Sequence, residues 1–132
     1  MPIIAATAAA FWSALLLILL MTLSVLAVRQ RRTHKVAQGH GGIPSVEAAI
    51  RAFGNASEYI PAGIGALAVL AVAGAPPVIV HIAGALLFAG RVAHAVGLSR
   101  TTSTSLGRVA GMILTWLAYV FAAVALLLYA VA

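Results

Sequence analysis

The stretch IIAATAAAFWSALLLILLMTLSVLAV, residues 3–28, contains no charged residue and is apolar over almost all of its length. At about 1.5 Å per residue, a helix of this length crosses a hydrocarbon core about 30 Å thick with some tilt. The competing interpretation is a secretory signal peptide, but the run has no basic start and is too long for one. The stretch therefore predicts a transmembrane helix, and with it a membrane protein.

Three further apolar segments follow this one. A polar, Gly-rich segment spans 29–45, and the next apolar runs cover 46–72, 78–97 and 106–131. Gly74-Ala75-Pro76-Pro77 marks a helix end and a tight turn, and 98–105 is a Ser/Thr loop. Strand-like alternation with regular turns is absent, which argues against a barrel. We expect one all-α integral membrane domain over 1–132, a four-transmembrane-helix bundle.

The composition excludes other classes of protein. Residues of the AVILMFWYC set make up 64% and charged residues 8% of the 132 residues, against a usual 45–50% or so and about 25% in soluble domains. This excludes a soluble domain and a disordered chain, and the lack of Cys excludes a disulfide scaffold. In a soluble chain the net charge of +6 would suggest nucleic acid. Here the basic residues are first explained by membrane topology, so we expect no nucleic-acid partner.

The basic residues also predict an orientation. Arg29, Arg31, Arg32 and Lys35 follow the first apolar run, and Arg100 lies between the third and fourth. The loop between the second and third runs has no charge. Positive residues favour the cytoplasmic side. We therefore expect the first and third loops in the cytoplasm and both termini outside.

A polar stripe runs along the first half of the second span. Glu47, Arg51, Asn55 and Glu58 are spaced 4, 4 and 3 residues apart, which places them on one face of a helix. Ionisable groups at this depth are costly in contact with lipid, so the stripe is expected to face a pocket or other helices. The alternative is a structural network, with a Glu47–Arg51 pair in a first turn capped by Ser45.

Three more polar residues converge on this end of the protein. Arg91 and His94 share a face of the third span, and Arg108 begins the fourth. Snorkelling to the interface is the alternative role for both arginines, and a structural role is the alternative for His94. Together with the stripe, these residues suit a small, multiply anionic ligand that also carries an amino group. His34 and His40 lack Cys or acidic partners, so no metal site is expected.

The stripe is also a motif. Glu47-x-x-x-Arg51-Ala52-x-x-Asn55-x-Ser57-Glu58-Tyr59-x-Pro61 closely resembles the second-helix signature of the MAPEG family, the membrane-associated proteins of eicosanoid and glutathione metabolism. That family includes leukotriene synthase and the microsomal glutathione transferases. Leu87-Phe88-Ala89-Gly90-Arg91, residues 74–77 and the pattern Gly90-Arg91-x-x-His94-Ala95-x-Gly97-Leu98-Ser99 resemble the small bacterial members. The resemblance implies a bacterial inner-membrane protein.

The resemblance also implies an assembly, a ligand and residue roles. It implies a homotrimer with glutathione bound at the cytoplasmic side, between helices of adjacent subunits. The glutathione contacts implied are Arg51, Asn55 and Glu58 on the second helix, Arg91 and His94 on the third, and an arginine at the end of the first helix. Arg31 is chosen for that last position over Arg29 and Arg32. Arg108 matches the arginine proposed to stabilise the glutathione thiolate. A trimer would also shield polar groups that one four-helix unit is too small to enclose.

The expected activity is a glutathione transferase or peroxidase that conjugates or reduces lipophilic electrophiles from the bilayer. Two departures bear on it: Leu98 replaces a glutathione-contacting Tyr of eukaryotic members, and no Tyr follows Arg108 until Tyr119. One alternative is therefore a glutathione or anion binder without turnover. Another is a small proton-coupled multidrug exporter, although such exporters carry their essential Glu on the first helix, where this chain has none.

Overall fold

The computed structural model describes residues 2–100 and 103–131, which form four helices. They are α1 (Pro2–Thr33), α2 (Pro44–Val72), α3 (Pro77–Arg100) and α4 (Leu106–Ala130). Each helix is long and apolar enough to cross a membrane. The predicted four-helix, all-α membrane architecture is confirmed.

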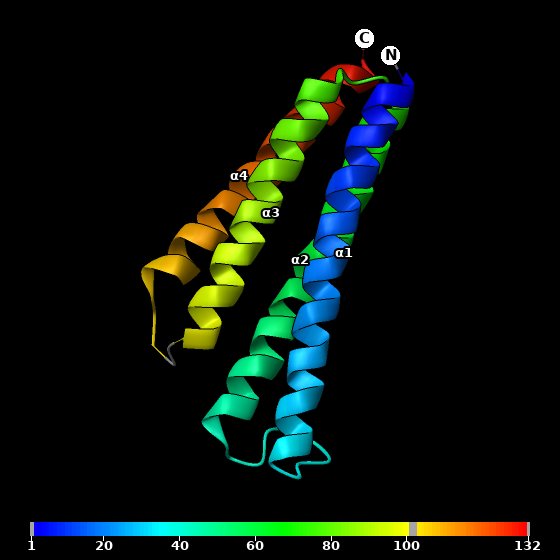
Figure 1. Cartoon of the computed structure of the whole chain (residues 1–132). Coiled ribbons are helices and arrows are strands. Elements are labelled where there is room, and N and C mark those ends of the chain that lie inside the picture. Colours follow the sequence, from blue (N-terminus) through cyan, green and yellow to red (C-terminus); the bar gives the residue numbers. More distant parts are fainter. Residues whose placement is uncertain (1, 101–102, 132) are drawn as a thin grey trace.

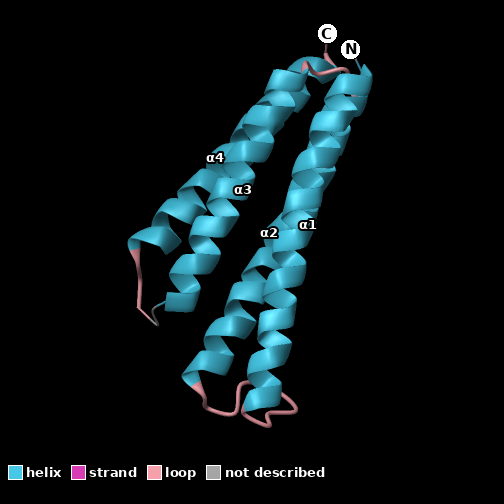
Figure 2. Cartoon of the chain, viewed as in Figure 1, coloured by secondary structure: helices cyan, strands magenta, loops and turns pink. Residues whose placement is uncertain are grey.

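The helices form two antiparallel hairpins, α1 with α2 and α3 with α4 (Figure 1). The second and third helices pack in the middle, while among the described residues α1 and α4 do not touch. Both termini lie at one end of the bundle, and the α1–α2 and α3–α4 loops lie at the other, which we call the loop end (Figures 1 and 2). The two hairpins diverge toward the loop end, where the sequence places its arginines.

The first and third helices are longer than the apolar runs predict. The first continues to Thr33, so Arg29, Arg31 and Arg32 are helical and not in a loop. Straight-chain residues such as Arg and Gln have high helix propensity, so the helix persists to Thr33, and Lys35, with a φ of 54°, then turns the chain. The third continues to Arg100, which makes Leu98 and Ser99 helical as well. Thr101 and Thr102 of the predicted loop lie outside the described residues.

The start of α2 also differs from the sequence prediction. Pro44 is the first helical residue and Ile43 the N-cap, so Ser45 does not cap the helix. The fixed φ of proline suits the first helical position, where its missing N–H is no loss. Ser45 instead lies with its Oγ 3.3 Å from Nε2 of His34. The other end of α2 matches the prediction, because Gly74 has a φ of +83° and α3 begins at Pro77.

The seam between α3 and α4 at the loop end is built from glycines. A Cβ added to Gly111 would lie 2.5 Å from the backbone nitrogen of His94, and one added to Gly97 would lie 2.6 Å from that of Arg108. The two backbones therefore approach as closely as small residues permit between membrane helices. This close approach places His94 and Arg108 side by side.

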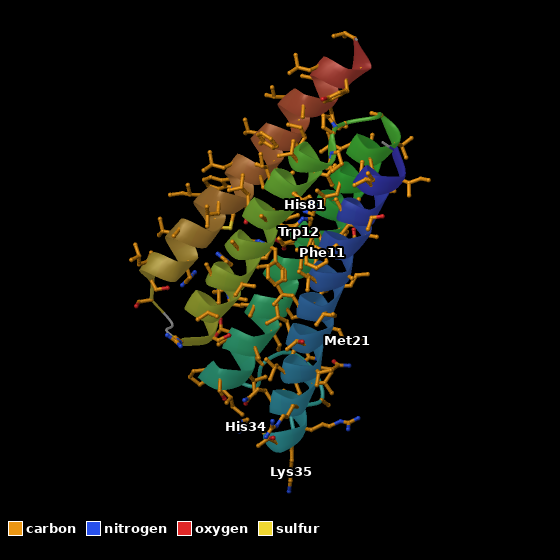
Figure 3. The ribbon with its side chains drawn as sticks, turned by 45° about the horizontal axis from the view of Figure 1, so that its top comes forward. Phe11, Trp12, Met21, His34, Lys35 and His81 are labelled. Carbon is orange, nitrogen blue, oxygen red and sulfur yellow. The ribbon has the colours of Figure 1, made fainter. Side chains whose placement is uncertain are left out.

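The half of the bundle nearer the termini is tied together by Trp12. Its indole Nε1–H donates to Nδ1 of His81 at 3.0 Å, which joins α1 to α3. Figure 3 shows the two side chains meeting between their helices, far from His34 and Lys35 at the loop end. A Cβ on Gly84 would lie 2.2 Å from the Trp12 ring, so glycine makes room for the indole. This half therefore holds the hairpins together while they diverge at the loop end.

Candidate functional site

An open pocket of about 530 Å³ lies at the loop end between α2, α3 and α4. Five residues predicted for the site line it, three from α2 and one each from α3 and α4: Arg51, Asn55, Glu58, His94 and Arg108. The rest of its lining is apolar or small, namely Ile50, Gly54, Leu98 and Met112. The fold thus brings together polar residues that lie up to 57 positions apart in the chain (108 − 51).

The α2 wall of the pocket is the polar stripe. Arg51 and Glu58 are exposed in the single chain, and Asn55 is half-buried. A guanidinium nitrogen of Arg51 lies 3.5 Å from a carboxylate oxygen of Glu47, and these side chains are 64% and 45% exposed. An ion pair this long and open contributes little stability. Arg51 is therefore free to exchange Glu47 for an anion in the pocket.

The opposite wall comes from the glycine seam. His94 is buried, and its Nδ1 lies 3.1 Å from the backbone carbonyl oxygen of Arg108. Because a carbonyl only accepts, Nδ1 carries the proton, and Nε2 is the remaining ring nitrogen. Ser105 caps α4 by accepting from the Arg108 backbone N–H at 3.4 Å. The Arg108 guanidinium donates to the Ser103 carbonyl at 2.9 Å, which fixes one end of a side chain that lines the pocket.

Arg91 lies behind the pocket wall and is not among the lining residues. Its side chain is 1% exposed, the most buried charge among the described residues. Its Nε donates to Thr115 Oγ1 at 2.9 Å, and one terminal nitrogen donates to Asn55 Oδ1 at 2.7 Å. The other terminal nitrogen lies 3.3 Å from the Met112 sulfur, and the guanidinium carbon is 4.8 Å from the centre of the Tyr59 ring. Snorkelling is excluded for Arg91, because its charge is held inside the bundle.

The arginine predicted from the first helix stands apart from the pocket within one chain. Arg31 is half-buried near the end of α1, and its Nε is buried without a hydrogen-bond partner. Arg29 and Arg32 line a separate groove on the surface of α1. None of the three α1 arginines is among the residues that line this pocket.

Sequence reasoning missed the residues that hold Arg91. Thr115 is fully buried on α4, where it accepts from Arg91 and donates to the Gly111 carbonyl at 2.8 Å. The Tyr119 hydroxyl donates to the Tyr59 carbonyl and joins α4 to α2. The sequence did contain a pattern that points to these residues. Thr115 lies seven residues after Arg108, and Tyr119 four after Thr115, so the three share one face of the helix.

Comparison with known proteins shows which family this chain belongs to. A sequence model of the MAPEG family matches residues 9–128. The chain belongs to the MAPEG family. It is also 38% identical over 120 residues to the inner membrane protein YecN of Escherichia coli strain K12, a match that covers 91% of this chain and 90% of that protein. The YecN protein of Escherichia coli O6:H1 strain CFT073 matches with the same identity and coverage.

These findings confirm the resemblance that the α2 motif indicated. Four apolar helices and similarity to an inner membrane protein support an integral inner-membrane protein. Within this MAPEG chain, the α2 motif supplies one wall of the pocket, and His94 on α3 and Arg108 on α4 are the polar residues of the other.

Proposed function

We propose that this MAPEG protein binds glutathione in the pocket between α2, α3 and α4 and transfers it to lipophilic electrophiles or reduces them. The observation that carries the proposal is the joint lining of one pocket by Arg51, Arg108, Glu58 and Asn55. Glutathione offers two carboxylates, one ammonium and two amide groups. Two guanidiniums, one carboxylate and one amide are complementary to that set.

The pocket suits such a ligand in size and charge. Its volume of about 530 Å³ lies within the range of roughly 300–1,000 Å³ typical of small-molecule sites. Arg51 and Arg108 come from α2 and α4, so they can meet two anionic groups of the ligand, a carboxylate and the thiolate, at separate places. Glu58 is the one acid in the lining and would accept from the ammonium group. A net positive pocket favours this anion over the cations that a multidrug exporter carries.

The proposed chemistry follows from Arg108 in the pocket lining. A thiol with a pKa of about 8.5 is only a few per cent thiolate at pH 7, and a nearby guanidinium raises that share. We assign this role to Arg108. The thiol proton leaves to water in the open pocket, and the thiolate sulfur then forms a bond to the electrophilic carbon. The leaving group departs with the electron pair of the bond that breaks. Where the electrophile is a hydroperoxide, the thiolate attacks its outer oxygen and releases the alcohol, and a second glutathione then displaces water to give the disulfide, so two glutathiones are oxidised for each peroxide reduced.

Binding without turnover is the second candidate, and one observation favours it. The lining residues include no hydroxyl group, because Leu98 occupies the position of the family tyrosine. A hydroxyl that donates to the sulfur would therefore be missing. Titration of the thiol of bound glutathione distinguishes the two candidates, because conjugation requires the thiol to ionise and binding does not.

The proposal includes the assembly and orientation. Arg51 and Glu58 are exposed in the single chain although α2 spans the membrane, and a homotrimer would enclose them. In this arrangement the loop end faces the cytoplasm, where glutathione is dissolved, and the termini face outside. Electrophiles would reach the pocket from the bilayer.

The direct test is calorimetric titration of the detergent-purified protein with glutathione. We expect wild type to bind, and Arg51→Ala and Glu58→Ala each to weaken binding by about 1.5–3 kcal/mol, the range for charge-assisted hydrogen bonds. Arg100→Ala is the matched control, because Arg100 is an exposed arginine of the loop end outside the pocket. The proposal fails if wild type does not bind, or if Arg51→Ala binds as tightly as Arg100→Ala.

A further inference from the structure

The Arg91 guanidinium is a buried cation that lacks an anionic partner. It is 1% exposed, and the ion pair found among the described residues joins Arg51 to Glu47, so no described carboxylate lies within 4.0 Å of it. A buried charge is costly unless hydrogen bonds or an opposite charge compensate it. At Arg91 hydrogen bonds to neutral acceptors offset this cost, and no opposite charge cancels the positive charge.

The guanidinium determines how its neighbours are oriented. Arginine carries five N–H donors and no acceptor, so each partner must present an electron-rich atom or face. Thr115 presents its hydroxyl oxygen at 2.9 Å, Met112 its sulfur at 3.3 Å, and Tyr59 the face of its ring. These partners come from α2 and α4, so Arg91 locks α3 to both neighbours.

Asn55 is the partner for which this requirement has a consequence in the pocket. Its Oδ1 accepts from Arg91 at 2.7 Å. The flipped amide would place its NH2 group against a guanidinium N–H, donor against donor, and is therefore excluded. Asn55 also lines the pocket, between Arg51 and Glu58 on the same face of α2. Its NH2 group is thus left as a donor that the α2 wall can offer to a ligand, in addition to the Arg51 guanidinium.

We propose that Arg91 is a positioning residue, which fixes the Asn55 amide so that the pocket offers an N–H donor and selects a ligand with a carbonyl or carboxylate acceptor there. This inference rests on the proposed function, because the ligand in question is glutathione. In this role Arg91 does not contact the ligand, and its buried guanidinium acts by orienting the Asn55 amide. The role of the charge is therefore separate from those of Arg51 and Arg108 in the pocket lining.

Asn55→Asp tests the orientation directly. The new carboxylate still accepts from Arg91 and now neutralises its charge, so the thermal unfolding midpoint should equal or exceed that of wild type. The carboxylate cannot donate to a ligand, so glutathione affinity should fall about tenfold or more, the change that one charge-assisted hydrogen bond represents. Asn55→Leu removes the donor without adding charge, and its affinity should fall as well.

Thr115→Val is the matched control on the other arm of Arg91. It removes the acceptor of Nε but leaves the Asn55 bond in place. We expect a lower unfolding midpoint and a glutathione affinity within about threefold of wild type, a change below the tenfold that 1.4 kcal/mol represents. Arg91→Lys keeps a donor for Asn55 and should bind more tightly than Arg91→Gln, whose side chain also accepts and lets the amide flip.

Each result bears on one of the two claims. If wild type shows no heat with glutathione, the proposed function fails. The Arg91–Asn55 bond is then judged without ligand, and an Asn55→Asp midpoint below that of Asn55→Leu would overturn it. If wild type binds, the positioning role is overturned when Asn55→Leu keeps its affinity, or when Thr115→Val loses as much affinity as Asn55→Asp.

Discussion

Replacing Gly111 by alanine should open the seam between α3 and α4. The added Cβ would lie 2.5 Å from the backbone nitrogen of His94, 2.6 Å from the Gly90 carbonyl oxygen and 2.7 Å from the His94 Cβ. Two of these atoms belong to the backbone, and the third is fixed to it. No rotamer change relieves the contact, so the helices have to move apart.

The size of the effect follows from two opposing contributions. Alanine is favoured over glycine inside a helix by about 1 kcal/mol. Overpacking of a closely packed interior typically costs about 1–3 kcal/mol, and backbone contacts belong at the upper end of that range. The free energy of unfolding of Gly111→Ala should therefore fall by about 2 kcal/mol.

Gly65 provides the matched control for the same chemical change. It lies inside α2, and a Cβ added there would meet nothing within 4 Å. Gly65→Ala should therefore gain the helix propensity alone, about 0.5–1 kcal/mol. The two alanine variants are then expected to differ by about 3 kcal/mol, in favour of Gly65→Ala.

Reversible unfolding in mixed detergent micelles measures this difference through the fluorescence of Trp12 and Trp116. The same samples titrated with glutathione report on the pocket, because a shift of α3 carries His94 with it. A Gly111→Ala protein as stable as Gly65→Ala would refute the packing argument. Loss of stability with unchanged glutathione affinity would show that the seam does not set the pocket.

Three further predictions concern the pocket and the assembly. Arg108→Ala should leave glutathione affinity within a few-fold of wild type but raise the thiol pKa of bound glutathione towards about 8.5. The absorbance of the thiolate during a pH titration measures this pKa, and identical curves for wild type and variant would rule out a thiolate role. Glu47→Gln should change the free energy of unfolding by no more than about 0.5 kcal/mol, because the Arg51–Glu47 pair is largely exposed. Calorimetry should show that this variant binds glutathione at least as tightly as wild type, and weaker binding would place Glu47 in the site. Native mass spectrometry in mild detergent should give trimers, and monomers alone would contradict the assembly.

The fold was predictable because the membrane imposes a simple rule on the sequence. In the hydrocarbon core the backbone must satisfy its own hydrogen bonds, so each long apolar run becomes a helix. The ends of those helices were less predictable. Hydropathy stops at Val28, but the Arg and Gln residues that follow continue the helix to Thr33. Ser45 is a good capping residue by type, yet Pro44 beside it takes the first helical position.

The candidate site was predictable where residues share one helix and less so where helices meet. The spacing of Arg51, Asn55 and Glu58 is fixed by helix geometry, and these residues line one pocket together. Arg91 and His94 share a face of α3 by the same rule, yet only His94 reaches the pocket. The reason is packing, because Thr115 on α4 and Asn55 on α2 draw the Arg91 guanidinium inward. Spacing on one helix contains no information about partners on others.

The position of Arg91 also bears on how a pocket near a membrane surface selects anions. Arg51 and Arg108 line the open pocket, so dissolved salt screens their attraction for a ligand. Arg91 is 1% exposed, and its field crosses a medium of low polarity before it reaches the pocket, so salt screens it much less. Affinity carried by Arg51 should fall as ionic strength rises, while the preference for an acceptor at Asn55 should persist. The pocket then combines a salt-sensitive attraction for anions with a salt-resistant choice among them, because that choice depends on the hydrogen bond that the buried Arg91 donates to Asn55.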